Sequence, residues 1–152
     1  MNLAARIVAR FASDSSEDNV QGAMKKVSYS AIFLDDASHR ELLAWWVKAT
    51  GLPLLSQVHG HHMTIKFKPS PEEVAQLDLG QKAKLRVIGW AADEKGQAVL
   101  VYPEVESTKA HPHITVSTDG GSPAYSNDLL AAGFTRVAGP TLDGVVDTFP
   151  RG

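Results

Sequence analysis

Two short stretches of the sequence share one pattern, a histidine followed two positions later by a threonine. The first, HMTI, begins at His62 and the second, HITV, begins at His113. Successive side chains of a strand point to opposite faces, so His62 shares a face with Thr64, and His113 shares one with Thr115. The alternate positions are apolar in both. Each stretch is therefore predicted to be a strand with one buried face and one face that offers an imidazole beside a hydroxyl.

Two such strands lying side by side would bring two imidazoles and two hydroxyls to one cleft, which suits phosphoryl transfer. One neutral imidazole can take a proton from an attacking water while the other, protonated, gives a proton to the leaving oxygen, and the hydroxyls hold phosphate oxygens. Histidine fits both roles because its pKa lies near neutral pH. Ser117 is in phase with His113 and Thr115, so it is predicted to bind substrate from the same face.

The elements that must position these residues follow from periodicity. Strands are expected at 25–34, 61–67, 84–92, 97–104 and 111–117, with one or two more in 135–149, and helices at 38–50, 70–77 and 122–133. Ser38 is the expected N-cap of the first helix with Glu41 as its capping-box partner, and Gly51 ends it. The turn DEKG should join the third and fourth strands into a hairpin. The sum predicts an α+β domain with a mostly antiparallel sheet.

The chain also divides into two similar halves. Each half offers a His-x-Thr strand followed by a helix that opens with Ser-Pro, at Ser70 and at Ser122. We therefore expect a two-lobed fold with pseudo-twofold antiparallel sheets and flanking helices, in which the two His-x-Thr strands meet.

Composition limits the classes of protein. A chain of 152 residues is long enough for one domain with a core. It has no cysteine, which excludes disulfides and thiol catalysis, and its formal charge of −2 argues against binding long duplex nucleic acid. No apolar run reaches the roughly 20 residues of a membrane span. We expect a cytoplasmic protein that does not act on membranes.

The first residues differ from the rest. Residues 1–12 predict a short amphipathic helix bearing arginines and no acidic residue, and a polar linker follows up to residue 23. The folded domain is expected at 24–152. A helix that rests on the domain or on a partner is the favoured interpretation, and organelle targeting by this segment is the alternative.

The two motifs resemble those of the two-histidine phosphoesterases, also called LigT-like or 2H proteins, whose signature is a pair of His-x-Thr/Ser-x motifs on the central strands of a two-lobed α+β fold. HMTI and HITV match it, and the order of elements agrees over about residues 25–149. Two motifs, each inside a predicted strand with an apolar alternate face, are a specific signal. The stretches HHMTI, HPHITVS and YSNDLL are most similar to the cyclic phosphodiesterase domain of fungal-type tRNA ligases.

The resemblance implies a function. His62 and His113 would be the acid–base pair, and Thr64 and Thr115 the hydroxyls that hold phosphate. Members of the family open 2′,3′-cyclic phosphates at RNA ends, cyclic phosphates on ADP-ribose derivatives, or 2′-5′ and cyclic oligonucleotides, without a metal or other cofactor. The expected substrate is a small nucleotide or an RNA 3′-end.

An aromatic face is a common site for a nucleobase. The candidates are Tyr29, on the first predicted strand, and Tyr125, which follows the second motif.

Other interpretations stay open. HGHH at 59–62 could attract zinc, although the aspartate and last histidine of a dinuclear metallo-hydrolase pattern are missing. The chain could instead degrade cyclic-oligonucleotide defence signals, or bind nucleotide ends without cleaving them. The adjacent Trp45 and Trp46 leave self-association open.

The remaining histidines are predicted to have no catalytic role. His59 and His61 are expected to be structural or at the surface, with His61 pointing away from the cleft, and His39 to be solvated. His111 is placed near the mouth of the cleft.

Overall fold

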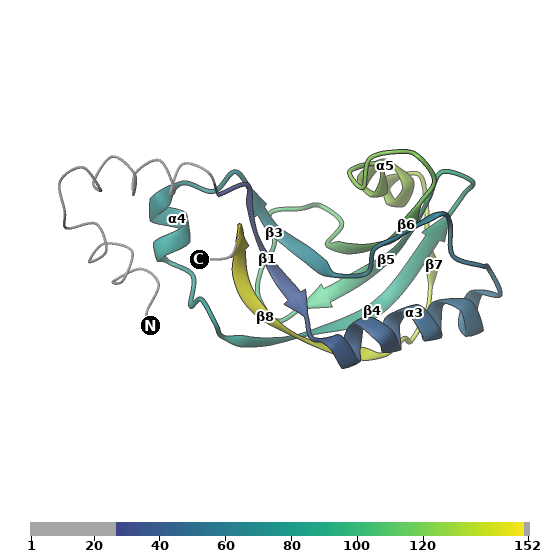
Figure 1. Cartoon of the computed structure of the whole chain (residues 1–152), viewed down its shortest axis with the longest axis horizontal. Helices are drawn as coiled ribbons and strands as arrows, with labels where there is room; N and C mark the ends of the chain where they lie inside the picture. The colour runs from purple at the N-terminus through teal and green to yellow at the C-terminus, as the bar shows by residue number, and fades with distance from the viewer. Residues whose placement is uncertain (1–26, 151–152) are drawn as a thin grey trace.

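The structure, a computed structural model, describes residues 27–150, which form an α+β fold around a closed antiparallel barrel (Figure 1). Its elements in chain order are β1 (Tyr29–Leu34), α3 (Asp36–Thr50), β2 (Gln57–Val58), β3 (His62–Phe67), α4 (Pro71–Ala75), β4 (Lys82–Ala92), β5 (Gly96–Pro103), β6 (His113–Thr118), α5 (Tyr125–Ala131), β7 (Thr135–Arg136) and β8 (Thr141–Phe149). The helix and linker predicted for residues 1–23 lie outside the described residues.

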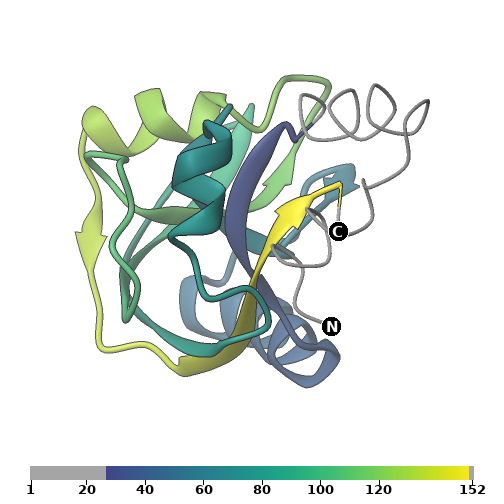
Figure 2. The same cartoon turned by 90° about the vertical axis from the view of Figure 1, so that its left-hand side faces the viewer.

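Six strands close the barrel. They follow the order β6, β3, β1, β8, β4 and β5, and β5 pairs again with β6, always antiparallel. Short β2 extends the sheet beside β6, and β7 pairs with β4. Figure 2 shows how the strands curve around a common interior. The predicted α+β class and antiparallel pairing are confirmed, whereas closure into a barrel was not predicted.

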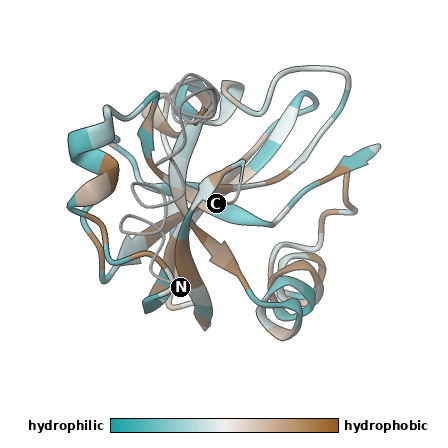
Figure 3. Cartoon of the chain, turned by 60° about the vertical axis from the view of Figure 1, so that its left-hand side comes forward, coloured by the Kyte–Doolittle hydropathy of each residue, from teal (hydrophilic) through white to brown (hydrophobic). Residues whose placement is uncertain are grey.

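The interior is filled by the apolar face of each strand. Met63, Ile65, Ile114 and Val116, which alternate with the motif residues, are all buried, as the sequence predicted. Burial of this kind contributes about 25 cal/mol for each Å² of apolar surface removed from water. Figure 3 shows the hydrophobic stretches concentrated in the strands at the middle of the fold. The alternation therefore fixes which face of β3 and of β6 is left for chemistry.

Helix α3 packs against the barrel through Leu42 and Trp46, which are fully buried. Its end at Gly51, with φ of 73°, agrees with the prediction. Its beginning does not, because Asp35 is the N-cap and its carboxylate accepts from the Ser38 backbone N–H at 2.7 Å. Ser38 instead turns inward, where its hydroxyl accepts from the backbone N–H of Asp143. An aspartate caps as well as a serine, so the earlier residue displaced the predicted capping box.

The other predicted elements hold with small changes. β4 and β5 form the expected hairpin, and α4 begins at Pro71 with a capping box between Ser70 and Glu73. Helix α5 opens at Tyr125, so Ser122 and the proline after it form a turn before the helix and are not its first residues.

The two motif strands, β3 and β6, pair over a very short length. The register of β3 and β6 contains a single pair, Met63 opposite Ile114. Beyond it the β5–β6 loop fills the gap, since the hydroxyl of Ser107 donates to the carbonyl of Thr64 at 2.9 Å and the backbone N–H of Thr108 donates to that of Ile65 at 2.9 Å. A cleft can therefore open between strands that remain joined at their centre.

Ile114→Ala tests the importance of that junction. Truncation of a fully buried isoleucine should lower the free energy of unfolding by about 2–5 kcal/mol, because apolar burial is lost and a cavity remains. Val58→Ala, at a position that is 45% exposed on the neighbouring β2, is the control and should cost under about 1 kcal/mol. Urea denaturation measures both, and equal costs would contradict the packing described.

Candidate functional site

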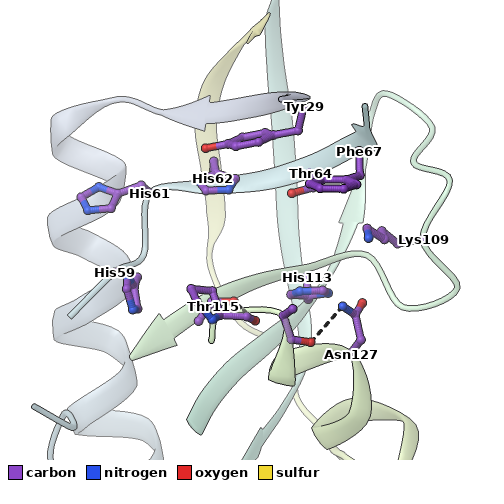
Figure 4. A pocket seen from close by; sticks show the side chains of 12 residues that line it. Tyr29, His59, His61, His62, Thr64, Phe67, Lys109, His113, Thr115 and Asn127 are labelled. Atoms are coloured by element: carbon purple, nitrogen blue, oxygen red, sulfur yellow. Dashed lines mark hydrogen bonds between the residues drawn. The ribbon is translucent and has the colours of Figure 1, made fainter. Parts of the chain in front are cut away.

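A cavity of about 230 Å³ opens over the polar faces of β3 and β6. It is lined by Tyr29, His59, His61, His62, Thr64, Phe67, Lys109, His113, Thr115, Pro123, Ala124 and Asn127. Figure 4 shows the side chains of both motifs directed into the same space. The two predicted histidines and two predicted threonines are therefore brought together.

The strand register explains how the motifs face each other. Residues on either side of an antiparallel pair lie opposite each other in reverse order, and the pair here is Met63 with Ile114. Extending that order by one residue on each side would place His62 toward Thr115 and Thr64 toward His113. The imidazoles and hydroxyls of both strands line the same cavity.

His62 is held by aromatic rings on β1. Its imidazole stacks on Tyr29 with ring centroids 4.9 Å apart, and the Phe33 ring lies 5.5 Å away. Burial, together with the nearby His61, His113 and His59, lowers the pKa of His62 to about 4. The ring is therefore neutral at neutral pH and can accept a proton.

Tyr29 lines the cavity as predicted, but its surroundings change its expected role. His62 covers one side of its ring, and Phe149 stacks on it with centroids 5.4 Å apart. These contacts make Tyr29 a residue that orients His62, and the stacking of Phe149 leaves less of its ring for a nucleobase. Burial raises the pKa of its phenol, which stays protonated as a hydrogen-bond donor.

His113 is oriented by its own strand. Its Nδ1 is 2.8 Å from the carbonyl oxygen of His111, and because a carbonyl only accepts, Nδ1 carries the proton. This leaves Nε2 for a ligand. Burial lowers the pKa of His113, while the hydrogen bond to the carbonyl of His111 acts in the opposite direction.

Thr115 is supported from α5. Its hydroxyl lies 2.8 Å from the hydroxyl of Ser126, which is buried, and 3.2 Å from the carbonyl of Pro123. Ser126 is thus a positioning residue that the sequence prediction missed, although the YSNDLL stretch that contains it was noted. The only signal available was its place in the first turn of a predicted helix.

Ser117 is not at the cavity, contrary to the prediction. It is fully buried, donates to the side-chain oxygen of Gln97 at 2.5 Å and accepts from the backbone N–H of Leu55. The cause is an irregularity in the β5–β6 register: Gln97 pairs with Ser117 and Ala98 with Thr115, so one extra residue of β6 shifts the alternation.

Tyr125 is also placed elsewhere. It borders a separate surface hollow with Lys95 and Asp128, and its hydroxyl donates to the carboxylate of Asp93. This interaction holds the start of α5 against the β4–β5 turn, so Tyr125 is structural.

Two histidines predicted to be structural or at the surface, His59 and His61, in fact line the cavity, although His61 was expected to point away from it. β3 begins only at His62, so the strand alternation used to turn His61 away does not extend to it. His39 is not simply solvated, because its Nδ1 donates to the carbonyl of Gly60 at 2.8 Å and its ring stacks on that of His61. His111 lies against Phe134 and does not line the cavity.

The opposite end of the cavity holds residues that the sequence did not reveal. Figure 4 shows Phe67, Lys109 and Asn127 there. Phe67 ends β3 and is 56% exposed, and Lys109 comes from the β5–β6 loop. Lys66, which is in phase with the motif residues, pairs with Glu73 at 2.5 Å and does not line the cavity. Only tertiary folding places a loop lysine here, so no sequence signal could have found it.

The types of residue that line the cavity favour an anion. Its lining contains four histidines and a lysine and no aspartate or glutamate. Within residues 27–150 no three histidine or carboxylate side chains are grouped as metal ligands would be.

No protein-family model matches the sequence, and no curated protein is significantly similar to it. None of the helices within residues 27–150 combines the length and the hydropathy of a membrane-crossing segment.

The pKa of His62 predicts how stability changes with pH. Between pH 4 and 6.5 the unfolded chain binds a proton at this histidine that the folded protein does not, so the free energy of unfolding should fall as pH falls through this range. The full effect is about 3 kcal/mol. His62→Asn should flatten the dependence in urea denaturation, whereas His111→Asn, outside the cavity, is the control. An unchanged slope in His62→Asn would contradict the burial of a neutral ring.

Proposed function

We propose that the protein is a metal-independent phosphodiesterase that hydrolyses 2′,3′-cyclic phosphates, or related cyclic or 2′-linked phosphodiesters, of nucleotides or RNA ends. The observation that supports this most is the convergence of both His-x-Thr pairs in one cavity without a carboxylate. A phosphodiester is an anion that needs one proton removed and one supplied during hydrolysis, and two imidazoles can do both.

We further propose that the fold is that of the two-lobed 2H phosphoesterases, most like the cyclic phosphodiesterase domain of fungal-type tRNA ligases. In support, β3 and β6 are neighbours, β3 has β1 on its other side, and β6 has β5. A helix also follows each motif strand. The barrel would then be two sheets joined at the motif strands.

The surroundings of the two histidines support a division of their roles. Every influence on His62 lowers its pKa, so we assign it as the base that takes a proton from water. His113 alone has a carbonyl that favours its protonated form, so its Nε2 is assigned as the acid that protonates the leaving oxygen. Thr64 would donate to a nonbridging oxygen as charge develops on it, and Thr115 would do the same once its hydroxyl hydrogen turns from the carbonyl of Pro123 to the phosphate.

The size of the cavity favours a chain end or a single nucleotide. Its volume of about 230 Å³ is below the roughly 300–1,000 Å³ of drug-sized ligand sites, so it suits a ribose phosphate better than a whole cyclic oligonucleotide. The base would lie at the rim, where the exposed ring of Phe67 offers a stacking surface.

A hydrolysis panel with EDTA present tests the activity. It contains nucleoside 2′,3′-cyclic phosphates, an RNA that ends in one, ADP-ribose 1″,2″-cyclic phosphate, and cyclic di- and trinucleotides. We expect cleavage of the first two classes, with about 10²–10⁴-fold lower kcat for His62→Ala and for His113→Ala, and about 10–100-fold for Thr64→Val or Thr115→Val. Near-normal turnover by both histidine variants would exclude the mechanism. Binding without cleavage of any substrate would leave a recognition module.

The assigned roles can be separated with a second substrate. In a cyclic phosphate whose leaving oxygen is replaced by sulfur, the thiolate departs without protonation. His113→Ala should therefore recover most of its lost rate on this substrate, whereas His62→Ala should not. Recovery by His62→Ala alone would reverse the assignment of acid and base.

The pH–rate profile should be bell-shaped and displaced to acid. The pKa values of His62 and His113 are both lowered, and the active form needs one ring neutral and the other protonated. The maximum of kcat/KM should then lie below pH 6.5, the ordinary pKa of histidine. A maximum above pH 8 would contradict two buried imidazoles as the acid–base pair.

A further inference from the structure

The HGHH stretch supplies three histidines, of which the proposed reaction uses only His62. The other two, His59 and His61, line the same cavity. Figure 4 shows them at the end beside α3, away from the end that holds Phe67 and Lys109. The cavity therefore has an imidazole-rich end that hydrolysis of a simple cyclic phosphate does not require.

Both imidazoles are held in place by the fold. The backbone N–H groups of His59 and Gly60 donate to the carbonyls of Val116 and Thr115, each at 2.8 Å, so this segment is fixed along β6. Gly60 has φ of 81°, a conformation that favours glycine, and it turns the chain from β6 toward β3. The segment therefore presents its histidines at a defined distance from both catalytic strands.

The nitrogens left for a ligand can be identified. The Thr118 hydroxyl donates to Gln57 at 3.2 Å, so at its 3.1 Å contact with His59 it accepts from Nε2–H. Nδ1 of His59 is then left for a ligand. The His61 ring stacks on that of His39 with ring centroids 4.5 Å apart, and its nitrogens make no hydrogen bond within residues 27–150. Burial, with His39 and His59 nearby, lowers the pKa of His61, so it is the N–H of a neutral ring that it offers to a ligand.

We propose that His59 and His61 form a subsite for a second phosphate, the one on the 5′ carbon of the ribose whose cyclic phosphate is cleaved. This rests on the proposed function. The 5′ and 2′,3′ oxygens lie at opposite ends of a ribose, so one nucleotide can place its cyclic phosphate between His62 and His113 and its 5′-phosphate at this end. The carboxylate-free lining favours a second anion. The substrate class is thus a 5′-phosphorylated nucleoside 2′,3′-cyclic phosphate, either free or as the last nucleotide of an RNA.

The kinetic test compares adenosine 2′,3′-cyclic phosphate with its 5′-phosphorylated form and with the dinucleotide ApA ending in a cyclic phosphate. The wild type should favour a 5′-phosphorylated substrate by about tenfold or more in kcat/KM, as expected for charge-assisted hydrogen bonds. In the double variant His59→Asn/His61→Asn this ratio should fall to near one, while the matched control His111→Asn keeps it. Preference for the dinucleotide over the free nucleotide would identify an RNA end as the source of the phosphate.

A binding arm separates this proposal from the reaction. Calorimetry measures adenosine 3′,5′-bisphosphate against adenosine 3′-monophosphate with the wild type and the double variant, after circular dichroism shows that the variant is folded. Tighter binding of the bisphosphate by the wild type only, without hydrolysis, would support the subsite and overturn the phosphodiesterase. The opposite result would be hydrolysis at equal rates with and without a 5′-phosphate, together with equal affinities for the bisphosphate and the monophosphate. It would overturn the subsite and leave the phosphodiesterase standing.

Discussion

The contact between Met63 and Ile114 is the constraint on which the site depends. These two residues are fully buried, and they form the only pair in the register of β3 with β6. Their burial turns the neighbouring positions of both strands outward, so two imidazoles and two hydroxyls reach one cavity. The buried apolar face of β3 and β6 thus positions the motif side chains, although the two strands pair over only one residue each.

The shortness of this junction matters as much as its position. A fully paired β3 and β6 would hold their side chains at regular spacing over a flat surface. The β5–β6 loop instead bonds to the carbonyls of Thr64 and Ile65, and the His59–Gly60 segment bonds to Thr115 and Val116. The cleft is therefore open at both ends of the pair, with aromatic and cationic groups at one end and further histidines at the other.

The placement of the histidines carries an electrostatic cost that fits an anionic ligand. Burial and the neighbouring imidazoles disfavour the charged form of His62, and no carboxylate in the cavity lining offsets this. A bound phosphate would supply the missing negative charge and favour protonation of one ring. The unbound site therefore lacks a negative charge that would stabilise a protonated imidazole, and a bound phosphodiester would supply it.

The sequence predicted the elements well because their signals are local. The period-two alternation located β3 and β6 and the four motif residues, and Gly51 and Pro71 marked the ends of helices. It failed for Ser117, where a bulge in β6 shifted the alternation, and for His61, which precedes the strand whose rule was applied to it. Lys109 and the covered ring of Tyr29 depend on contacts between distant segments, which no local pattern reveals.

The most direct test of the account is a crystal structure of the wild-type protein with a nucleoside vanadate, which mimics five-coordinate phosphorus. The account predicts that His62 and His113 lie on opposite sides of the vanadium atom, each with a ring nitrogen within about 3 Å of a vanadate oxygen. It also predicts that the hydroxyls of Thr64 and Thr115 lie within about 3 Å of vanadate oxygens. Binding that reaches only one of the two histidines, or that lies in the hollow beside Tyr125, would contradict it.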